Sequence, residues 1–183
     1  MHSYKMGDTW LHKTTSEKDL GIVIDYKLNM SQQSDVTTEK ANAILGCIDR
    51  NIVSKTCEVL VFLYSALVRP YLEHCVQFWT PHFKKNANKL EQVQRRATRM
   101  IGGLDTKPYE ERLKELGMFS LEKRRLRGDR IALFKYLRGC HTEEGQDLFS
   151  IITKCRTCNN GLKLKKARFW LNIRKNLLTV RAA

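Results

Sequence analysis

The segment LEQVQRRATRMIGGL, residues 90–104, carries the clearest helical periodicity in this sequence of 183 residues. At 100° per residue its apolar side chains fall within an arc of about 100°. These side chains are Leu90, Val93, Ala97, Met100, Ile101 and Leu104. Arg95 and Arg99 project from the opposite side, with Arg96 on its flank. The pattern predicts a helix over about residues 86–104 with one packing face and one cationic face, ended by Gly102-Gly103.

Two helices are expected upstream of this segment. Ser31 is a candidate cap for a helix that ends near Asn51. Its expected apolar positions are Val36, Ala43, Ile44, Cys47 and Ile48. A second helix begins around Ser54, is apolar on nearly every side, and is predicted to form the core of a bundle. Its apolar residues are Val59, Leu60, Phe62, Leu63, Ala66 and Leu67. Pro70 disfavours regular helix, so residues 71–79 either continue beyond a kink or form a separate helix.

Downstream, Thr106 and Pro108 mark the start of a short helix that ends at Gly117 and turns Leu113 and Leu116 inward. Ser120 is expected to cap a longer helix over residues 121–138. The residues predicted to share its apolar face are Leu126, Ile131, Leu133, Phe134 and Leu137, with Arg130 in their midst. Residues 147–152 are expected to add one or two helical turns, and residues 162–180 alternate basic and apolar side chains.

The first 30 residues have β character. Residues 2–12 predict two short strands around the turn pair Gly7-Asp8, and residues 17–25 include a β-branched run with the length of a buried strand. The expected fold class is therefore mainly α: a helical bundle with a small N-terminal antiparallel β element. We divide the chain into a β part (1–30), a helical bundle (31–105) and a basic helical extension with an irregular tail (106–183).

Charge is distributed unevenly along the chain. Residues 1–82 contain 8 Lys and Arg against 9 Asp and Glu, whereas the remainder contains 25 against 10. All the excess positive charge therefore lies in the second half, which indicates a polyanionic partner, most often nucleic acid. The apolar run 59–68 is too short to cross a bilayer and no secretory signal is present, so we expect an intracellular protein with reduced cysteines and no membrane partner.

Residue patterns that would carry catalysis or bind metal are weak. Cys155 and Cys158 have the spacing of half a zinc site, with Cys140 and His141 upstream, but adjacent residues rarely chelate one ion together, so no metal site is predicted. A redox role for the cysteine pair lacks its usual βαβ context. No Asp-Asp pair is present for a two-metal site, and no catalytic residue is assigned.

The cationic clusters are the candidate functional residues. They are Arg95, Arg96 and Arg99; Lys123, Arg124, Arg125 and Arg127; and Lys163, Lys165, Lys166 and Arg168. Each is compatible with an ordinary solvated face. Three clusters together, with Phe169 and Trp170 available to stack on bases, favour nucleic-acid binding without sequence-specific readout.

Several long motifs resemble one family. They are EKDLGIVIDYKLNMSQQ (17–33), LYSALVRPYLEHCVQFW (63–79), LEQVQRRATRMIGGL (90–104), YEERLKELGMFSLEKRRLRGD (109–129) and GLKLKKARFWLNIRKN (161–176). Together they resemble the C-terminal part of the reverse transcriptase of LINE-type, non-LTR retrotransposons of the chicken-repeat clade. The resemblance implies that residues 31–104 form a polymerase thumb and that the following residues form a basic extension of it.

The same resemblance implies specific roles and absences. Asp19, Leu20 and Gly21 match the element that supports the primer end, a primer-grip-like role. In the family, the catalytic aspartates and their Mg²⁺ lie in a palm upstream of the matched region. We therefore expect a fragment of an RNA-directed DNA polymerase, translated from an internal methionine, that is inactive alone and needs no cofactor.

The resulting functional expectation is binding of RNA or RNA/DNA hybrid through the basic helical face, with the palm as a possible protein partner. The alternative is a non-catalytic protein, domesticated or derived from a pseudogene, whose basic face has no nucleic-acid role. Partners that survive nuclease treatment would favour this alternative.

Overall fold

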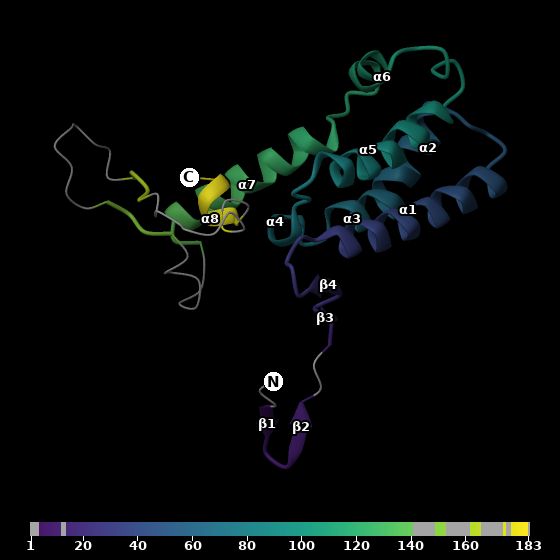
Figure 1. Cartoon of the computed structure of the whole chain (residues 1–183). Coiled ribbons are helices and arrows are strands. Elements are labelled where there is room, and N and C mark those ends of the chain that lie inside the picture. Colours follow the sequence, from purple (N-terminus) through teal and green to yellow (C-terminus); the bar gives the residue numbers. More distant parts are fainter. Residues whose placement is uncertain are drawn as a thin grey trace.

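The structure is a computed structural model that describes residues 4–11, 14–140, 149–152, 162–165, 174 and 177–182. Two hairpins precede the helices (Figure 1). The strands are β1 (Tyr4–Met6), β2 (Thr9–Leu11), β3 (Ser16–Asp19) and β4 (Ile22–Asp25). The helical segments are α1 (Ser31–Asn51), α2 (Cys57–Leu63), the π-helical η1 (Tyr64–Val68), α3 (Arg69–Glu73), α4 (Val76–Trp79), α5 (Lys84–Arg99), α6 (Tyr109–Glu115), α7 (Leu121–Leu137) and α8 (Leu178–Arg181). The expected fold class, mainly α with a small N-terminal antiparallel β element, is confirmed.

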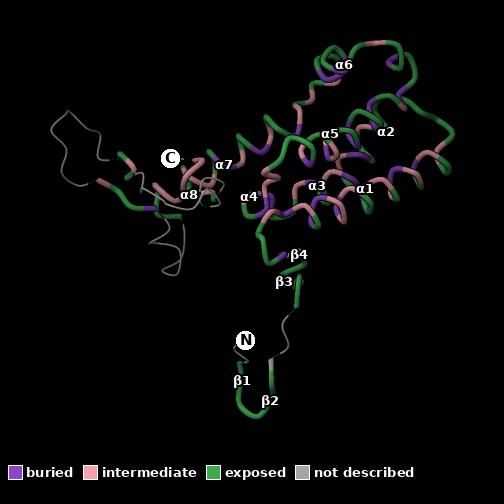
Figure 2. The backbone as a smooth tube through the Cα atoms, viewed as in Figure 1, coloured by how far each residue is buried: buried purple, intermediate pink, exposed green. Residues whose placement is uncertain are grey.

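The two hairpins are separate antiparallel pairs, β1 with β2 and β3 with β4. The single buried strand expected over residues 17–25 is wrong, because Leu20 and Gly21 have φ of 47° and 84° and reverse the chain in a turn. The β1–β2 hairpin stands apart from the helices in Figure 1, and its described side chains are exposed (Figure 2). The β3–β4 hairpin is joined to α1, since the Val23 amide donates to Gln33 Oε1 at 2.9 Å.

Helix α1 has the bounds predicted for it, but its buried face differs. Met30, with φ of 57°, takes the N-cap position, and the side chain of Asn29 accepts from the Ser31 amide at 2.9 Å. The residues that α1 buries are Gln33, Ser34, Thr37, Ala41, Leu45 and Ile48. Of the five apolar positions expected there, only Ile48 is buried. Polar side chains fit this face because they are hydrogen-bonded: Ser34, for example, donates to the Met30 carbonyl at 2.8 Å.

The segment α2–η1–α3 is continuous through Pro70 and widens into a π-type turn, where the Arg69 amide donates to the Tyr64 carbonyl. This segment is less buried than the sequence suggested, because Leu60 is buried whereas Phe62 is 70% exposed and Leu67 is 46% exposed. The core instead lies between α1, α5 and one side of this segment, and it includes Trp79 of α4. Its most deeply buried apolar residues are Ala41, Val68, Trp79, Leu90, Val93, Leu72 and Leu121.

Helix α7 extends away from this core and contacts α5 and α4 (Figure 1). The expected cap is confirmed, because the Ser120 side chain accepts from the Lys123 amide. The expected apolar face is wrong. Ile131 and Phe134 are 44% and 58% exposed, and the residues that α7 buries are Leu121, Arg125 and Asp129. Arg130 is exposed, so its charge carries no burial cost.

None of the helices in the described part of the chain combines the length and the apolar character that a bilayer crossing requires.

Candidate nucleic-acid interface

Helix α5 has the two faces that its sequence predicted. Leu90, Val93 and Ala97 are buried, and Arg95, Arg96 and Arg99 are exposed. Helical periodicity separates the two sets, because residues three or four apart share a side of the helix. The first cationic cluster is therefore displayed on a helix whose other side is anchored in the core.

A further arginine, Arg112 of α6, joins this cluster. The Arg95 guanidinium carbon lies 4.5 Å from the centroid of the Tyr109 ring, and that of Arg112 lies 5.7 Å from it. Arg112 is 3% exposed, and its Nε and Nη1 atoms have no hydrogen-bond partner among the described residues. Burial lowers the pKa of Arg112, and the nearby charge of Arg99 lowers it further. Arg112 was not among the residues predicted from the sequence, since a lone arginine amid the charged residues of a short helix gives no signal of burial.

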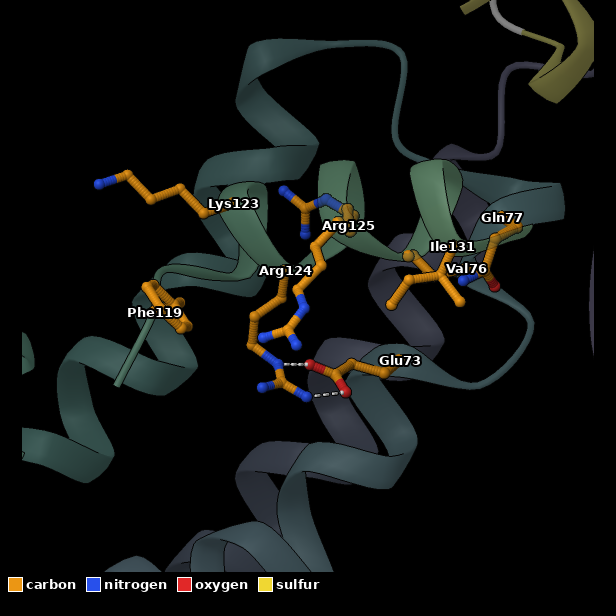
Figure 3. A pocket seen from close by; sticks show the side chains of 10 residues that line it. Glu73, Val76, Gln77, Phe119, Lys123, Arg124, Arg125 and Ile131 are labelled. Atoms are coloured by element: carbon orange, nitrogen blue, oxygen red, sulfur yellow. Dashed lines mark hydrogen bonds and ion pairs between the residues drawn. The ribbon is translucent and has the colours of Figure 1, made fainter. Parts of the chain in front are cut away.

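The second cluster, at the start of α7, divides into two kinds of residue. Lys123 and Arg127 are exposed, as expected. Arg124 instead forms a bidentate pair with Glu73 of α3, with Nη2 to Oε2 at 2.9 Å (Figure 3). This hydrogen-bonded pairing raises the pKa of Arg124. Arg125 is only 8% exposed. Of the four cations, Lys123 and Arg127 are therefore exposed, Arg124 is paired with Glu73, and Arg125 is buried.

The burial of Arg125 follows from helix geometry. Leu121, Arg125 and Asp129 are spaced by four residues, so they lie along one side of α7. That side faces the helical body, because α7 contacts α4 and α5. Burial lowers the pKa of Arg125, and four surrounding carboxylates oppose that effect. Residues of the basic cluster thus occupy the packing face of α7 as well as its exposed face.

The first two clusters meet in space. A cavity of about 520 Å³ is lined by Arg95 from α5 and by Lys123 and Arg125 from α7. Lys114 of α6 also lines it, together with the acidic residues Glu91, Glu110 and Glu122. Arg95 and Lys123, which are 28 positions apart in the sequence, therefore line one cavity. We call the exposed cations of the two clusters the basic band: Arg95, Arg96, Arg99, Lys123 and Arg127.

The third cluster lies elsewhere. Lys163 and Lys165 flank Leu164, which pairs with Ile151, and the Lys165 amide donates to the Ser150 carbonyl at 2.7 Å. This pairing follows Phe149, whose carbonyl accepts from the Tyr136 hydroxyl at 2.6 Å. Tyr136 is near the end of α7, so at 1.5 Å per residue it lies about 20 Å along the helix from Lys123. Lys166 and Arg168 are outside the described residues, as are Phe169 and Trp170.

Asp19, Leu20 and Gly21 are at the tip of the β3–β4 hairpin, and all three are exposed. The Leu20 carbonyl is 3.5 Å from His74 Nε2, at the end of α3. Gly21 and His74 also line a smaller cavity of about 280 Å³ beside α1. None of the cations of the basic band lines this cavity, so the structure does not bring the primer-grip-like residues together with them.

Within the described ranges, no three His, Cys, Asp or Glu side chains gather in an arrangement that could hold a metal ion. Cys140 is exposed, and Cys155, Cys158 and His141 are outside those ranges.

Comparison with known proteins finds no family model, no curated protein and no solved structure that matches this chain. The geometry of the basic band and the sequence motifs therefore carry the functional proposal.

Proposed function

We propose that this chain binds RNA or RNA/DNA hybrid through the basic band, without sequence preference, as the thumb and basic extension of a non-LTR retrotransposon reverse transcriptase. The observation that carries the proposal is the exposure of the five residues of the basic band. All five are exposed, and none belongs to an ion pair found in the described residues. Their charges are thus available to an external anion. Binding of phosphates by such residues releases counterions from the nucleic acid, which supplies affinity without reading base identity.

The helical scaffold supports this function physically. Arg95 and Arg99 project from a helix whose buried side includes Leu90 and Val93, at 0% and 1% exposure. A rigid helix holds its cations at fixed spacing, so a regular phosphate backbone meets several of them at once. The Tyr109 ring further restricts the position of the Arg95 guanidinium.

In this proposal the chain supplies binding and the palm of the polymerase supplies catalysis. Exposed apolar side chains on the two hairpins favour contact with another protein surface. They include Tyr4, Met6, Trp10 and Leu20, each at least 59% exposed. The palm is the protein partner that the sequence resemblance implies, and the site of action is intracellular.

The test is a salt series of binding to a short RNA/DNA hybrid, followed by fluorescence anisotropy. We expect log affinity to fall with log salt concentration by about 0.7 to 0.9 per phosphate contact. Replacing Arg95 and Arg99 by Glu should weaken binding by about tenfold or more and reduce the slope by about 2. The matched control replaces Lys27 and Arg50, two exposed cations outside the band, by Glu. Both double variants change the net charge equally. A flat salt dependence, or equal losses in both variants, would contradict the proposal.

A further inference from the structure

Arg125 lines a second cavity, of about 530 Å³, which lies between α3, α4 and α7 (Figure 3). We call it the α7 cavity. Four cations line it, namely Lys123, Arg124, Arg125 and Arg127, and Glu73 is its single carboxylate. The neighbouring cavity of about 520 Å³ is lined by four cations and three carboxylates. The α7 cavity is therefore the more positive of the two and the better site for an anion.

Arg125 is short of hydrogen-bond partners. It is 92% buried, its Nη1 atom has no hydrogen-bond partner among the described residues, and none of the ion pairs found in those residues includes it. A buried, unsatisfied guanidinium is costly, and in a native structure it calls for an explanation. A bound anion would supply the missing acceptor.

The surrounding carboxylates do not satisfy Arg125 because most are engaged by other donors. Glu73 accepts from Arg124, Asp129 accepts from Arg181, and Glu91 accepts from the Tyr109 hydroxyl and from the Leu121 amide. Glu122 is exposed. The protein thus places three acids near Arg125 and directs each of them to a different donor, which leaves the guanidinium available to a ligand.

The remaining walls of the α7 cavity are apolar and aromatic. In Figure 3, Val76 and Ile131 lie together on one side and Phe119 lies on the other, while Lys123 extends away from the Arg124–Glu73 pair. Phe119 is 51% exposed, so its ring is accessible. Proteins bind a nucleotide unit with an accessible aromatic ring beside a cationic site. The base stacks on the ring, and the cations hold the phosphate. The volume is within the range of ordinary ligand pockets.

We propose that the α7 cavity binds the phosphate of a nucleotide, with Arg125 as the buried anchor, Lys123 and Arg127 at the rim, and the adjoining base stacked on Phe119. The shared chemistry is a phosphorylated nucleotide, which is either one unit of an RNA strand or a free mononucleotide. If the nucleotide is one unit of an RNA strand, this inference rests on the proposed function. Binding of a free mononucleotide at the α7 cavity does not depend on that function.

The experiment compares the wild-type chain with Arg125→Met and with Arg130→Met, which changes an exposed arginine on α7 that does not line the cavity. Inorganic phosphate and AMP are added at constant ionic strength, and the melting temperature is recorded. A short single-stranded RNA is titrated separately. We expect phosphate and AMP to raise the melting temperature of the wild type and of Arg130→Met but not of Arg125→Met. RNA affinity should fall at least about tenfold in Arg125→Met alone.

The stability of unliganded Arg125→Met separates a ligand site from a structural role. Methionine fills similar space without a buried charge, so the ligand-binding role predicts a variant at least as stable as the wild type. A less stable variant with unchanged response to phosphate and AMP would overturn the inference. If Arg125→Met does not fold, the double variant Lys123→Gln with Arg127→Gln, at the exposed rim, takes its place. This double variant should weaken AMP binding at least about tenfold. Unchanged AMP binding would overturn the inference.

Two further outcomes separate this inference from the proposed function. RNA binding with a steep salt slope, but no dependence on Arg125 and no effect of phosphate, rejects the α7 cavity and leaves the proposed function standing. Arg125-dependent protection by phosphate and AMP without RNA binding supports the cavity and rejects the proposed function. Phe119→Leu should weaken AMP binding by at least about fivefold while leaving protection by inorganic phosphate unchanged; equal loss for both ligands would reject the stacking role.

Discussion

Arg181 of α8 donates two hydrogen bonds to the carboxylate of Asp129 in α7, from Nε to Oδ2 at 2.7 Å and from Nη2 to Oδ1 at 3.0 Å. Its Nη2 also donates to the Gln77 carbonyl at 2.6 Å. A residue near the end of the chain thereby joins α7 to the segment around α4. Asp129 is 5% exposed, so this pair is largely shielded from solvent.

Replacing Arg181 by Met should lower the free energy of unfolding by roughly 3 to 5 kcal/mol, because it leaves the Asp129 carboxylate buried without its partner. Urea unfolding followed by circular dichroism measures this change. The double variant Arg181→Met with Asp129→Leu should recover much of the loss, since it removes both charges. A double variant as unstable as the single one would show that the pair is not the cause.

Replacing Tyr109 by Phe should lower the free energy of unfolding by about 1 to 3 kcal/mol, because the Tyr109 hydroxyl donates to the charged Glu91 carboxylate. Tyr71→Phe is the control, since Tyr71 is 47% exposed. The same urea experiment applies to both variants. Equal stability of the two would count against a structural role for the Tyr109–Glu91 hydrogen bond.

Replacing Gly128 by Ala tests how closely α7 approaches α4. A Cβ atom there would lie 2.7 Å from Gln77 Nε2, the end of a flexible side chain. Alanine favours the helical state by about 1 kcal/mol over glycine. We expect net stabilisation of about 0.5 kcal/mol, smaller than for Gly46→Ala in α1, where an added Cβ meets nothing within 4 Å. Thermal unfolding of the two variants ranks them; a clear loss of stability in Gly128→Ala would mean that Gln77 cannot move.

His82 should make the protein less stable in mild acid. Burial lowers its pKa below the ordinary value of 6.5, Arg181 lowers it further, and Asp25 opposes them. The unfolded chain therefore takes up the proton at a higher pH than the folded chain does, so the free energy of unfolding falls as the pH drops below about 6.5. Above that pH both states are neutral at this residue. The decrease between about pH 7.5 and pH 5.5 should be smaller in His82→Gln than in the wild type; equal decreases would exclude His82 as a contributor.

The sequence predicted the elements whose signals are local. The amphipathic pattern of α5, the Ser120 cap of α7 and the bounds of α1 each depend on residues within one or two turns of a helix. The hairpin at Leu20-Gly21 was missed because a β-branched run concealed the turn. The polar side of α1 was missed because Gln33 and Ser34 are buried with hydrogen bonds, Gln33 accepting from the Val23 amide of β4 and Ser34 donating to the Met30 carbonyl at the N-cap of α1.

The α2–η1–α3 segment shows why a regular helical period failed. Leu60, Tyr64, Val68 and Leu72 are all buried, at intervals of four residues. In a regular α-helix three such steps would rotate the buried side by about 120°. The wider π-type turn reduces this drift and accommodates Pro70, which lacks a backbone donor. A regular period of 3.6 residues therefore predicted apolar residues on nearly every side of this helix. The segment in fact buries a single narrow side.

For the candidate site, the sequence correctly placed the exposed arginines of α5 and the exposed Lys123 and Arg127 of α7. It did not indicate that Arg112 and Arg125 are buried, or that Arg124 pairs with Glu73. These outcomes depend on which carboxylates the tertiary structure brings near each guanidinium. Residues 73 and 124 are 51 positions apart, and no local pattern links them.

The chain has 33 Lys and Arg residues, and exposed ones outside the ion pairs of the described residues, such as Lys123 and Arg127, contribute mainly the sign of their charge. Arg124 and Arg181 differ, because each forms two parallel hydrogen bonds to one carboxylate. Lysine would keep the charge at these positions and lose the fork that makes the second bond. In a set of diverging copies of this sequence, arginine-to-lysine exchange should accordingly be frequent across the basic surface and selected against at these two positions.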